Sequence, residues 1–255
     1  MKMTKKIFIS LLLMVFAPLA GMAQDNVEAE VEVTVLSKYL WRGQQKGGVS
    51  LQPGATLTWK GAFVNVEGNK GFNREDQEEL DINIGYQFPF GLNVGLSDMW
   101  NYEDRNHGQY FFYKDKETSH QLEGNIGYSC RYFDLQAYCM FWGNDYKLDG
   151  KRAYSTYIEL AVPFKLGGLD WTVSAGMTPM ESAGAYTTLY DEKGQEEGWE
   201  RNYFYADGPA CVSAVLRAQK ELRYKSIEIP VFVELNTNPY MKTAAFLAGF
   251  TFKPF

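Results

Sequence analysis

The sequence has few of the residues from which disulfide frameworks, metal centres and nucleophilic active sites are built. Only three cysteines and two histidines occur in 255 residues. Cys130, Cys139 and Cys211 are odd in number and widely separated, so they predict no disulfide framework in an exported protein. Zinc-type ligand clusters, phosphate-binding glycine loops and nucleophile elbows are also missing, and we therefore expect no metal and no cofactor.

Long apolar runs are missing after the N-terminal segment. A helix needs about 20 consecutive apolar residues to cross a bilayer, and no segment beyond residue 23 reaches that length. If the chain crosses a membrane, it must therefore do so as a closed β-barrel, in which neighbouring strands satisfy each other's backbone hydrogen bonds.

The N-terminal segment has the parts of a secretory signal peptide. Three lysines precede the apolar residues 7–20, and small residues then lead up to Ala23. We predict cleavage between Ala23 and Gln24, which removes residues 1–23 and leaves residues 24–255 as one domain. The apolar run is shorter than a membrane-spanning helix, which disfavours the alternative of an N-terminal anchor.

Positive charge is scarce in the predicted mature chain. Without residues 1–23 it carries 22 lysines and arginines against 31 aspartates and glutamates, a formal charge of −9. A surface that binds nucleic-acid phosphates needs the opposite balance, so we expect no nucleic-acid partner. The remaining length of about 230 residues suits a single β-barrel domain.

The mature chain does have strict alternation of apolar and polar residues, the pattern of strands with one apolar face. In residues 79–90, aliphatic and aromatic residues hold the even positions and mostly polar residues the odd ones. The first such segment runs from Ala29 to Arg42, with Tyr39 and Trp41 on the apolar face. About twelve such segments occur, an even number, as in single-chain outer-membrane barrels. The predicted fold is all-β, a transmembrane antiparallel up-and-down β-barrel.

A soluble β-sandwich also alternates, so the connections and the aromatic residues must decide between the two folds. Short turns are predicted at residues 60–61, 89–91, 129–132, 166–168 and, somewhat longer, 219–224, with longer polar segments at 68–77, 103–118, 143–152 and 179–208. Aromatic residues cluster at both ends of the apolar faces, as in the two interfacial girdles of a membrane barrel. Both features favour a barrel in a bacterial outer membrane, with the short turns in the periplasm.

One segment resembles a known family. Residues 37–44 (SKYLWRGQ), followed by residues 48–53 (GVSLQP), are similar to the first hairpin of the porin family often labelled TorF-type. Residues 230–240 (PVFVELNTNPY) resemble the penultimate strand of that family. The resemblance implies an outer-membrane β-barrel with a pore function and no assigned catalysis, and it implies no particular substrate.

The polar face of the predicted strands carries twelve acids against six bases. We expect the lumen to be lined by Glu28, Glu30, Glu32, Glu67, Glu79, Asp81, Glu123, Asp134, Glu159, Asp170, Glu228 and Glu234, with Lys38, Arg42, Lys60, Lys165, Arg217 and Lys253. This excess predicts a channel for small polar solutes or ions that prefers cations. In the alternative, the charges pair and form a plugged structural or surface-interaction barrel, because about twelve strands give an intermediate width.

A third function, an outer-leaflet lipid-active enzyme, is the least favoured. His120 lies at the loop end of a predicted strand, on the same face as Asp98 of the preceding strand. Hydrolysis would also need a nucleophile within reach of the histidine, and no serine has the matching spacing. We therefore predict that the protein is not an enzyme.

The long acidic segment and the C-terminus complete the sequence-based expectations. Residues 179–208 are open to three interpretations: a constriction folded into the barrel, a divalent-cation site, or a solvated surface, which is the simplest. Phe250, Phe252 and Phe255 continue the alternation to the end of the chain. This resembles the terminal-strand signal of outer-membrane barrels, so we expect the assembly machinery and outer-membrane lipid as partners.

Overall fold

The structure is a computed structural model that describes residues 27–102, 109–190, 194, 196–224 and 227–253. The predicted cleavage site at Ala23 and the predicted assembly signal at Phe255 lie outside these residues. The strands are β1 (Val27–Leu36), β2 (Tyr39–Trp41), β3 (Gln44–Gly47), β4 (Ser50–Trp59), β5 (Ala62–Gly71), β6 (Glu79–Gln87), β7 (Leu92–Asn101), β8 (His120–Ser129), β9 (Asp134–Gly143), β10 (Thr156–Leu166), β11 (Leu169–Thr178), β12 (Gly184–Tyr190), β13 (Glu196–Tyr203), β14 (Ala210–Tyr224), β15 (Ile227–Asn238) and β16 (Thr243–Phe252).

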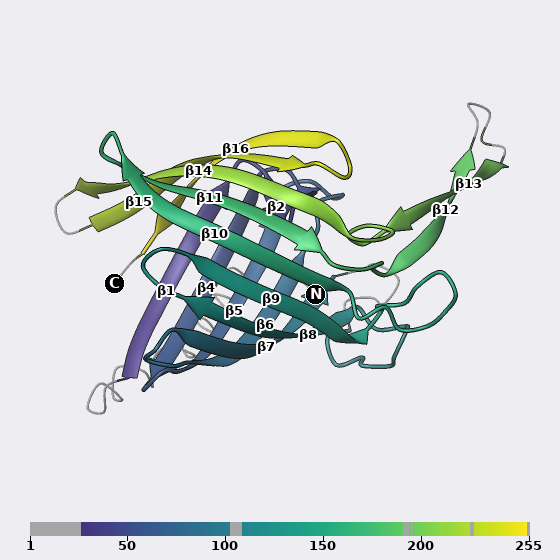
Figure 1. Cartoon of the computed structure of the whole chain (residues 1–255), viewed down its shortest axis with the longest axis horizontal. Coiled ribbons are helices and arrows are strands. Elements are labelled where there is room, and N and C mark those ends of the chain that lie inside the picture. The colour runs from purple at the N-terminus through teal and green to yellow at the C-terminus, as the bar shows by residue number, and fades with distance from the viewer. Residues whose placement is uncertain (1–26, 103–108, 191–193, 195, 225–226, 254–255) are drawn as a thin grey trace, which may run out of the picture.

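Twelve of these strands form one closed antiparallel barrel, in the order β1-β4-β5-β6-β7-β8-β9-β10-β11-β14-β15-β16 and back to β1 (Figure 1). Each wall strand pairs with the next wall strand along the chain, which is the up-and-down arrangement. The predicted twelve-stranded all-β barrel is thus confirmed. No helix in the described part of the chain is long and apolar enough to span a membrane.

Tight turns at one end of the barrel set the register of the wall. Lys60 and Gly61 both have positive φ, 51° and 90°, as a two-residue hairpin turn requires, and Trp59 pairs with Ala62 around them. Gly167 and Gly168 make the corresponding turn between β10 and β11 with φ of 63° and 75°. The short turns gather at the left end of the barrel in Figure 1 and the longer segments at the right end.

This register turns the aliphatic side chains of the wall strands outward. Ile84, Leu96 and Ile126, on the neighbouring strands β6, β7 and β8, are 46%, 51% and 54% exposed. Comparable residues on the other wall strands continue this apolar belt around the barrel. At the short-turn end the belt finishes in exposed aromatic rings, among them Trp59 and Phe90.

The first strand is shorter than predicted. β1 ends at Leu36, and residues 39–47 leave the wall to form a small hairpin, β2–β3, which we call the inner hairpin. Tyr39 is buried inside the barrel with Leu36, Phe232 and Leu247. The prediction of one strand to Arg42 with Tyr39 and Trp41 on the outer face is therefore wrong, because the packing of these rings inside the barrel outweighs continued pairing in the wall.

Two connections also differ from the prediction. Residues 219–224, expected as a turn, extend β14, whose Leu222 pairs with Ile229 of β15. Residues 179–208, expected to be irregular, contain the paired strands β12 and β13, which project away from the barrel (Figure 1). The described side chains of this hairpin are mostly exposed and form no continuous apolar face, and alternation therefore gave no signal.

Candidate functional site in the barrel interior

The turn of the inner hairpin is fixed against the opposite wall. Arg42 and Gly43 have φ of 48° and 80°, the left-handed region that favours glycine. A Cβ on Gly43 would lie 1.9 Å from the carbonyl oxygen of Val212 on β14. The Gly43 carbonyl also accepts a hydrogen bond from Asn238 Nδ2 at 3.3 Å. Only a glycine fits between the hairpin and β14 at this position.

Arg42 holds the hairpin to β8 through a buried ion pair. Its two terminal nitrogens each donate to one carboxylate oxygen of Glu123 at 2.6 Å, and Glu123 is 2% exposed. Nη1 also donates to the hydroxyl oxygen of Tyr205 at 2.6 Å. The guanidinium lies over the rings of Trp41 and Tyr138, at 4.4 and 4.2 Å. Bidentate pairing gives this contact both strength and a fixed orientation.

Residues 204–206 form a second inner segment beside the hairpin. Tyr205 and Ala206 are buried, and both backbone N–H groups donate to Ser182 Oγ, at 2.8 and 3.1 Å. Phe204 accepts a hydrogen bond from the Gln44 side chain. Of the interpretations of residues 179–208, two therefore apply to different parts: residues 204–206 narrow the barrel, and β12–β13 form an exposed surface.

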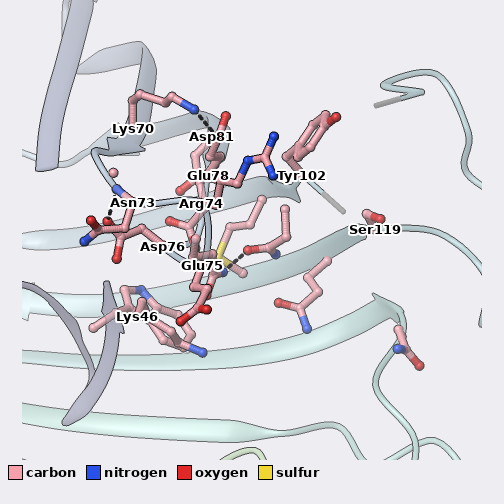
Figure 2. Close-up of a pocket in the computed structure, with 18 of the residues that line it drawn as sticks. Lys46, Lys70, Asn73, Arg74, Glu75, Asp76, Glu78, Asp81, Tyr102 and Ser119 are labelled. Carbon is pink, nitrogen blue, oxygen red and sulfur yellow. Dashed lines mark hydrogen bonds and ion pairs between the residues drawn. The ribbon is translucent and has the colours of Figure 1, made fainter. Parts of the chain in front are cut away.

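The inner hairpin separates two cavities in the lumen. The cavity on the long-loop side has a volume of about 850 Å³ and includes Trp41 and Lys46 of the hairpin in its lining (Figure 2). The cavity on the short-turn side measures about 400 Å³ and is lined by Tyr39 and Leu40. The interior is therefore obstructed near its middle but is not filled.

Carboxylates without basic partners gather on the wall formed by β5 and β6. Glu67 pairs across the strands with Asp81, and Glu79 accepts a hydrogen bond from the Tyr39 hydroxyl. In the described chain none of these three forms an ion pair, and Asp81 Oδ1 has no hydrogen-bond partner. Glu32 extends the group toward the short-turn side, where Lys253 lies 3.6 Å away.

The other predicted lumen residues are distributed over several environments. Several of them form ion pairs: Arg217 with Glu234 at 3.8 Å, Glu30 with Lys253, Asp170 with Lys165 at 2.7 Å and Glu228 with Arg223 at 3.0 Å. Two carboxylates accept hydrogen bonds, Glu159 from Tyr157 at 2.7 Å and Asp134 from Ser129 at 3.0 Å. Lys38 is half-buried after β1. Asp170 and Glu228 are 61% and 53% exposed at the short-turn rim. The structure therefore does not gather all these charges into one lining.

A loop carboxylate ties the inner hairpin to the segment after β5. Asp76 accepts hydrogen bonds from the backbone N–H groups of Gly48 and Asn73, both at 2.8 Å. These bonds, the one from Gly48 first, favour the ionised carboxylate and lower the pKa of Asp76 below its ordinary value. The loop-side end of the hairpin is thus held by a charge-assisted contact outside the wall.

His120 lies on the outer face, under the loop that precedes β8. Its Nδ1 is 2.7 Å from Asp98 Oδ1, and its Nε2 contacts the carbonyl oxygen of Tyr110. The ring of Tyr113 stacks on the imidazole with centroids 3.9 Å apart. The predicted proximity of His120 and Asp98 is confirmed. Both ring nitrogens are engaged by oxygen atoms, so neither is left to activate a nucleophile.

Comparisons with known proteins find similarity to solved structures at low sequence identity. No protein-family model and no curated protein matches the chain. The solved structure of the NanC porin is 8% identical over 87% of this chain and 97% of its own, with a TM-score of 0.46. OmpF of Salmonella typhi, in complex with daunomycin, is 8% identical over 89% and 97%, with a TM-score of 0.35. At such low similarity we base the function on the residues of this chain.

Sequence reasoning missed several residues that shape the interior. Tyr205 and Lys46 face the lumen from segments that lie outside the wall strands, where alternation carries no information. The one available signal was the Arg42-Gly43 pair in the segment that resembles the TorF-type family. In the described residues no group of three or more histidine, cysteine, aspartate or glutamate side chains is arranged to hold a metal ion.

Proposed function

We propose that the protein is an outer-membrane barrel of the TorF-type porin kind, with a narrow passage that prefers cations. The apolar belt supports the membrane location, because soluble monomers rarely expose contiguous apolar patches larger than a few hundred Å². Exposed aromatic rings at the edge of the belt suit a membrane–water interface. The pattern of a signal peptide in residues 1–23 supports export.

The observation that carries the channel proposal is the acidic wall beside the inner hairpin. Glu79 and Asp81 line the loop-side cavity and Glu32 lines the turn-side cavity. Glu67 is exposed to solvent and is the cross-strand neighbour of Asp81. Carboxylates that line a narrow aqueous space raise the local cation concentration. We place the passage along this wall, away from the neutralised Arg42–Glu123 pair.

The decisive experiment is planar-bilayer recording of the refolded protein in a salt gradient. The wild type should select K⁺ over Cl⁻, most strongly at low salt, because the Debye length is about 30 Å at 0.01 M and about 10 Å at 0.1 M. The double variant E67Q/D81N should lose most of this preference. The matched control D170N/E228Q removes two exposed, paired carboxylates at the rim and should keep it. Anion selectivity, or equal effects of both variants, would overturn the proposal.

The plugged barrel is the second candidate, and the buried Arg42–Glu123 pair favours it. In that case the wild type shows no conductance, and current appears only when the pair is broken.

Orientation is tested by epitope tags on intact cells. A tag after Gly194 should be detected at the surface and a tag after Gly61 should not, because the short turns of such barrels face the periplasm.

A further inference from the structure

Lys46 occupies an unusual position for a lysine. It lies on β3 of the inner hairpin and is half-buried. Its Nζ lies 5.5 Å from the ring centroid of Trp41 and 5.3 Å from that of Phe204. The same cavity is lined by Glu79 and Asp81, and Figure 2 shows Lys46 on the side opposite the loop residues Arg74 and Tyr102.

The other interior bases are held differently. Arg42, Arg217 and Lys253 each face a carboxylate within 4 Å. Lys70, on the rim of the same cavity, pairs with Glu78 and is 62% exposed. In the described part of the chain, Lys46 has no such ion pair. Its ammonium group instead lies near two aromatic rings, and the carboxylates of Glu79 and Asp81 line the same cavity.

We propose that the position filled by the Lys46 ammonium is a cation site, and that small organic ammonium ions are the ligands it fits. Aromatic faces with carboxylates nearby are the surroundings that attract ammonium groups, most strongly where water is excluded. The Lys46 ammonium is covalently attached to the chain, so it occupies this site at all times in the wild-type protein. It therefore repels a second cation and limits cation flow through the passage, a role that rests on the proposed channel function.

The site is tested by binding, without reference to conductance. K46A leaves a space for propylammonium, the part of the lysine side chain that the substitution removes, whereas K46M fills the space without a charge. Isothermal titration in detergent should show propylammonium binding to K46A about tenfold or more tighter than to K46M and wild type, with no binding of neutral propanol. Equal binding to all three proteins, or equal binding of propanol and propylammonium, would overturn the proposal.

The effect on ion flow is measured with the matched control K70A, which removes the same charge from the same cavity but leaves the aromatic position occupied. K46A and K46M should both raise the K⁺ to Cl⁻ permeability ratio, and propylammonium should return K46A toward the wild-type ratio. An equal rise in K70A would show that net charge, not this site, is responsible. If no protein conducts, the channel proposal fails, while the binding titration still decides the ammonium site.

Discussion

The two sides of the lumen wall have the same outer face and different inner faces. On β9 and β10 the inward side chains are large. Met140 and Tyr157 are almost completely buried, and Tyr157 packs with Tyr205 and Ala206. On β4, β5 and β6 many inward positions carry short polar residues such as Thr56 and Asn65, beside the carboxylates of the acidic wall. Alternation determines that a barrel forms, whereas the size of the inward residues determines where the barrel is filled.

Hydrogen bonds hold the short polar side chains of β4, β5 and β6 along the wall, which leaves this side of the lumen unfilled. Asn65 donates to Thr56 at 3.0 Å and accepts from Asn83 at 2.8 Å, so these short side chains lie along the wall across three strands. On the filled side, Tyr157 donates to Glu159 at 2.7 Å, and its ring lies 5.6 Å from that of Tyr205. Polar residues bonded to each other within the wall leave room for water, and aromatic residues that reach across it do not.

The largest effect is expected when the Arg42–Glu123 ion pair on the filled side of the lumen is broken. Arg42→Ala leaves the Glu123 carboxylate buried without a partner, which should lower the free energy of unfolding by about 3–5 kcal/mol. The inner hairpin should also detach and conductance should rise. The control R42M/E123L removes both charges and should cost clearly less. Denaturant titration checks both variants, and an R42A protein as stable as the wild type would contradict the assigned role of the pair.

The next effect compares two glycines with positive φ. Gly167→Ala has no atom within 4 Å of the new Cβ and should cost about 1–2 kcal/mol from backbone strain alone. Gly43→Ala adds the collision with Val212 and should cost about 1–3 kcal/mol more. The difference between the losses of unfolding free energy in the two variants measures how strongly the hairpin turn is held against β14. Equal costs would mean that the turn moves freely away from β14.

A smaller effect is expected on the outer face. His120→Ala leaves Asp98 with the Tyr113 hydroxyl, at 2.6 Å, as its remaining side-chain partner. The variant should lose about 1–3 kcal/mol of unfolding free energy, because the contacts of the imidazole with Asp98 and with the Tyr110 carbonyl are lost. Single-channel conductance should not change, because the residue lies outside the lumen. A change in ion selectivity would show that the outer loop and the interior are coupled.

The smallest effect is the pH dependence at the loop end of the hairpin. The lowered pKa of Asp76 means that its stabilising effect is present above the ordinary carboxyl pKa and is lost as pH falls through the lowered value. Asp76→Asn removes this dependence. The stability difference between wild type and D76N should therefore be largest near neutral pH and should decrease as the pH falls below about 4 toward the lowered pKa. A difference that grows on acidification would have the wrong sign for this contact.

The barrel was predictable because its signal is local. Ile84 and Leu96 face outward because successive side chains of a strand point to opposite faces, which is also why they alternate with polar residues in the sequence. Lys60-Gly61 specifies its turn without contacts from the rest of the chain. The inner hairpin was not predictable in this way. Tyr39 and Trp41 keep the period of β1, and only distant partners on β8, β14 and β15 show that these residues have left the wall.

The charges of the lumen were predictable as a set but not in their roles. A count of twelve acids and six bases treats Glu123 and Glu67 alike. In the structure Glu123 is neutralised by Arg42 from a segment 81 residues away, whereas Glu67 remains without a basic partner in the described chain. Long-range pairing decides which carboxylates act on a passing ion, and the alternation of a single sequence does not contain that information.

The attachment of the inner hairpin has a consequence for how the current would fluctuate. The hairpin leaves the wall at the end of β1 and returns at the start of β4, and these two strands are adjacent and paired over ten residues. It is thus bound to the wall at both ends, so that a hairpin released from its contacts with β8 and β14 cannot diffuse away. Reseating is then a unimolecular event, so each open channel should flicker between two current levels with dwell times that are independent of protein concentration.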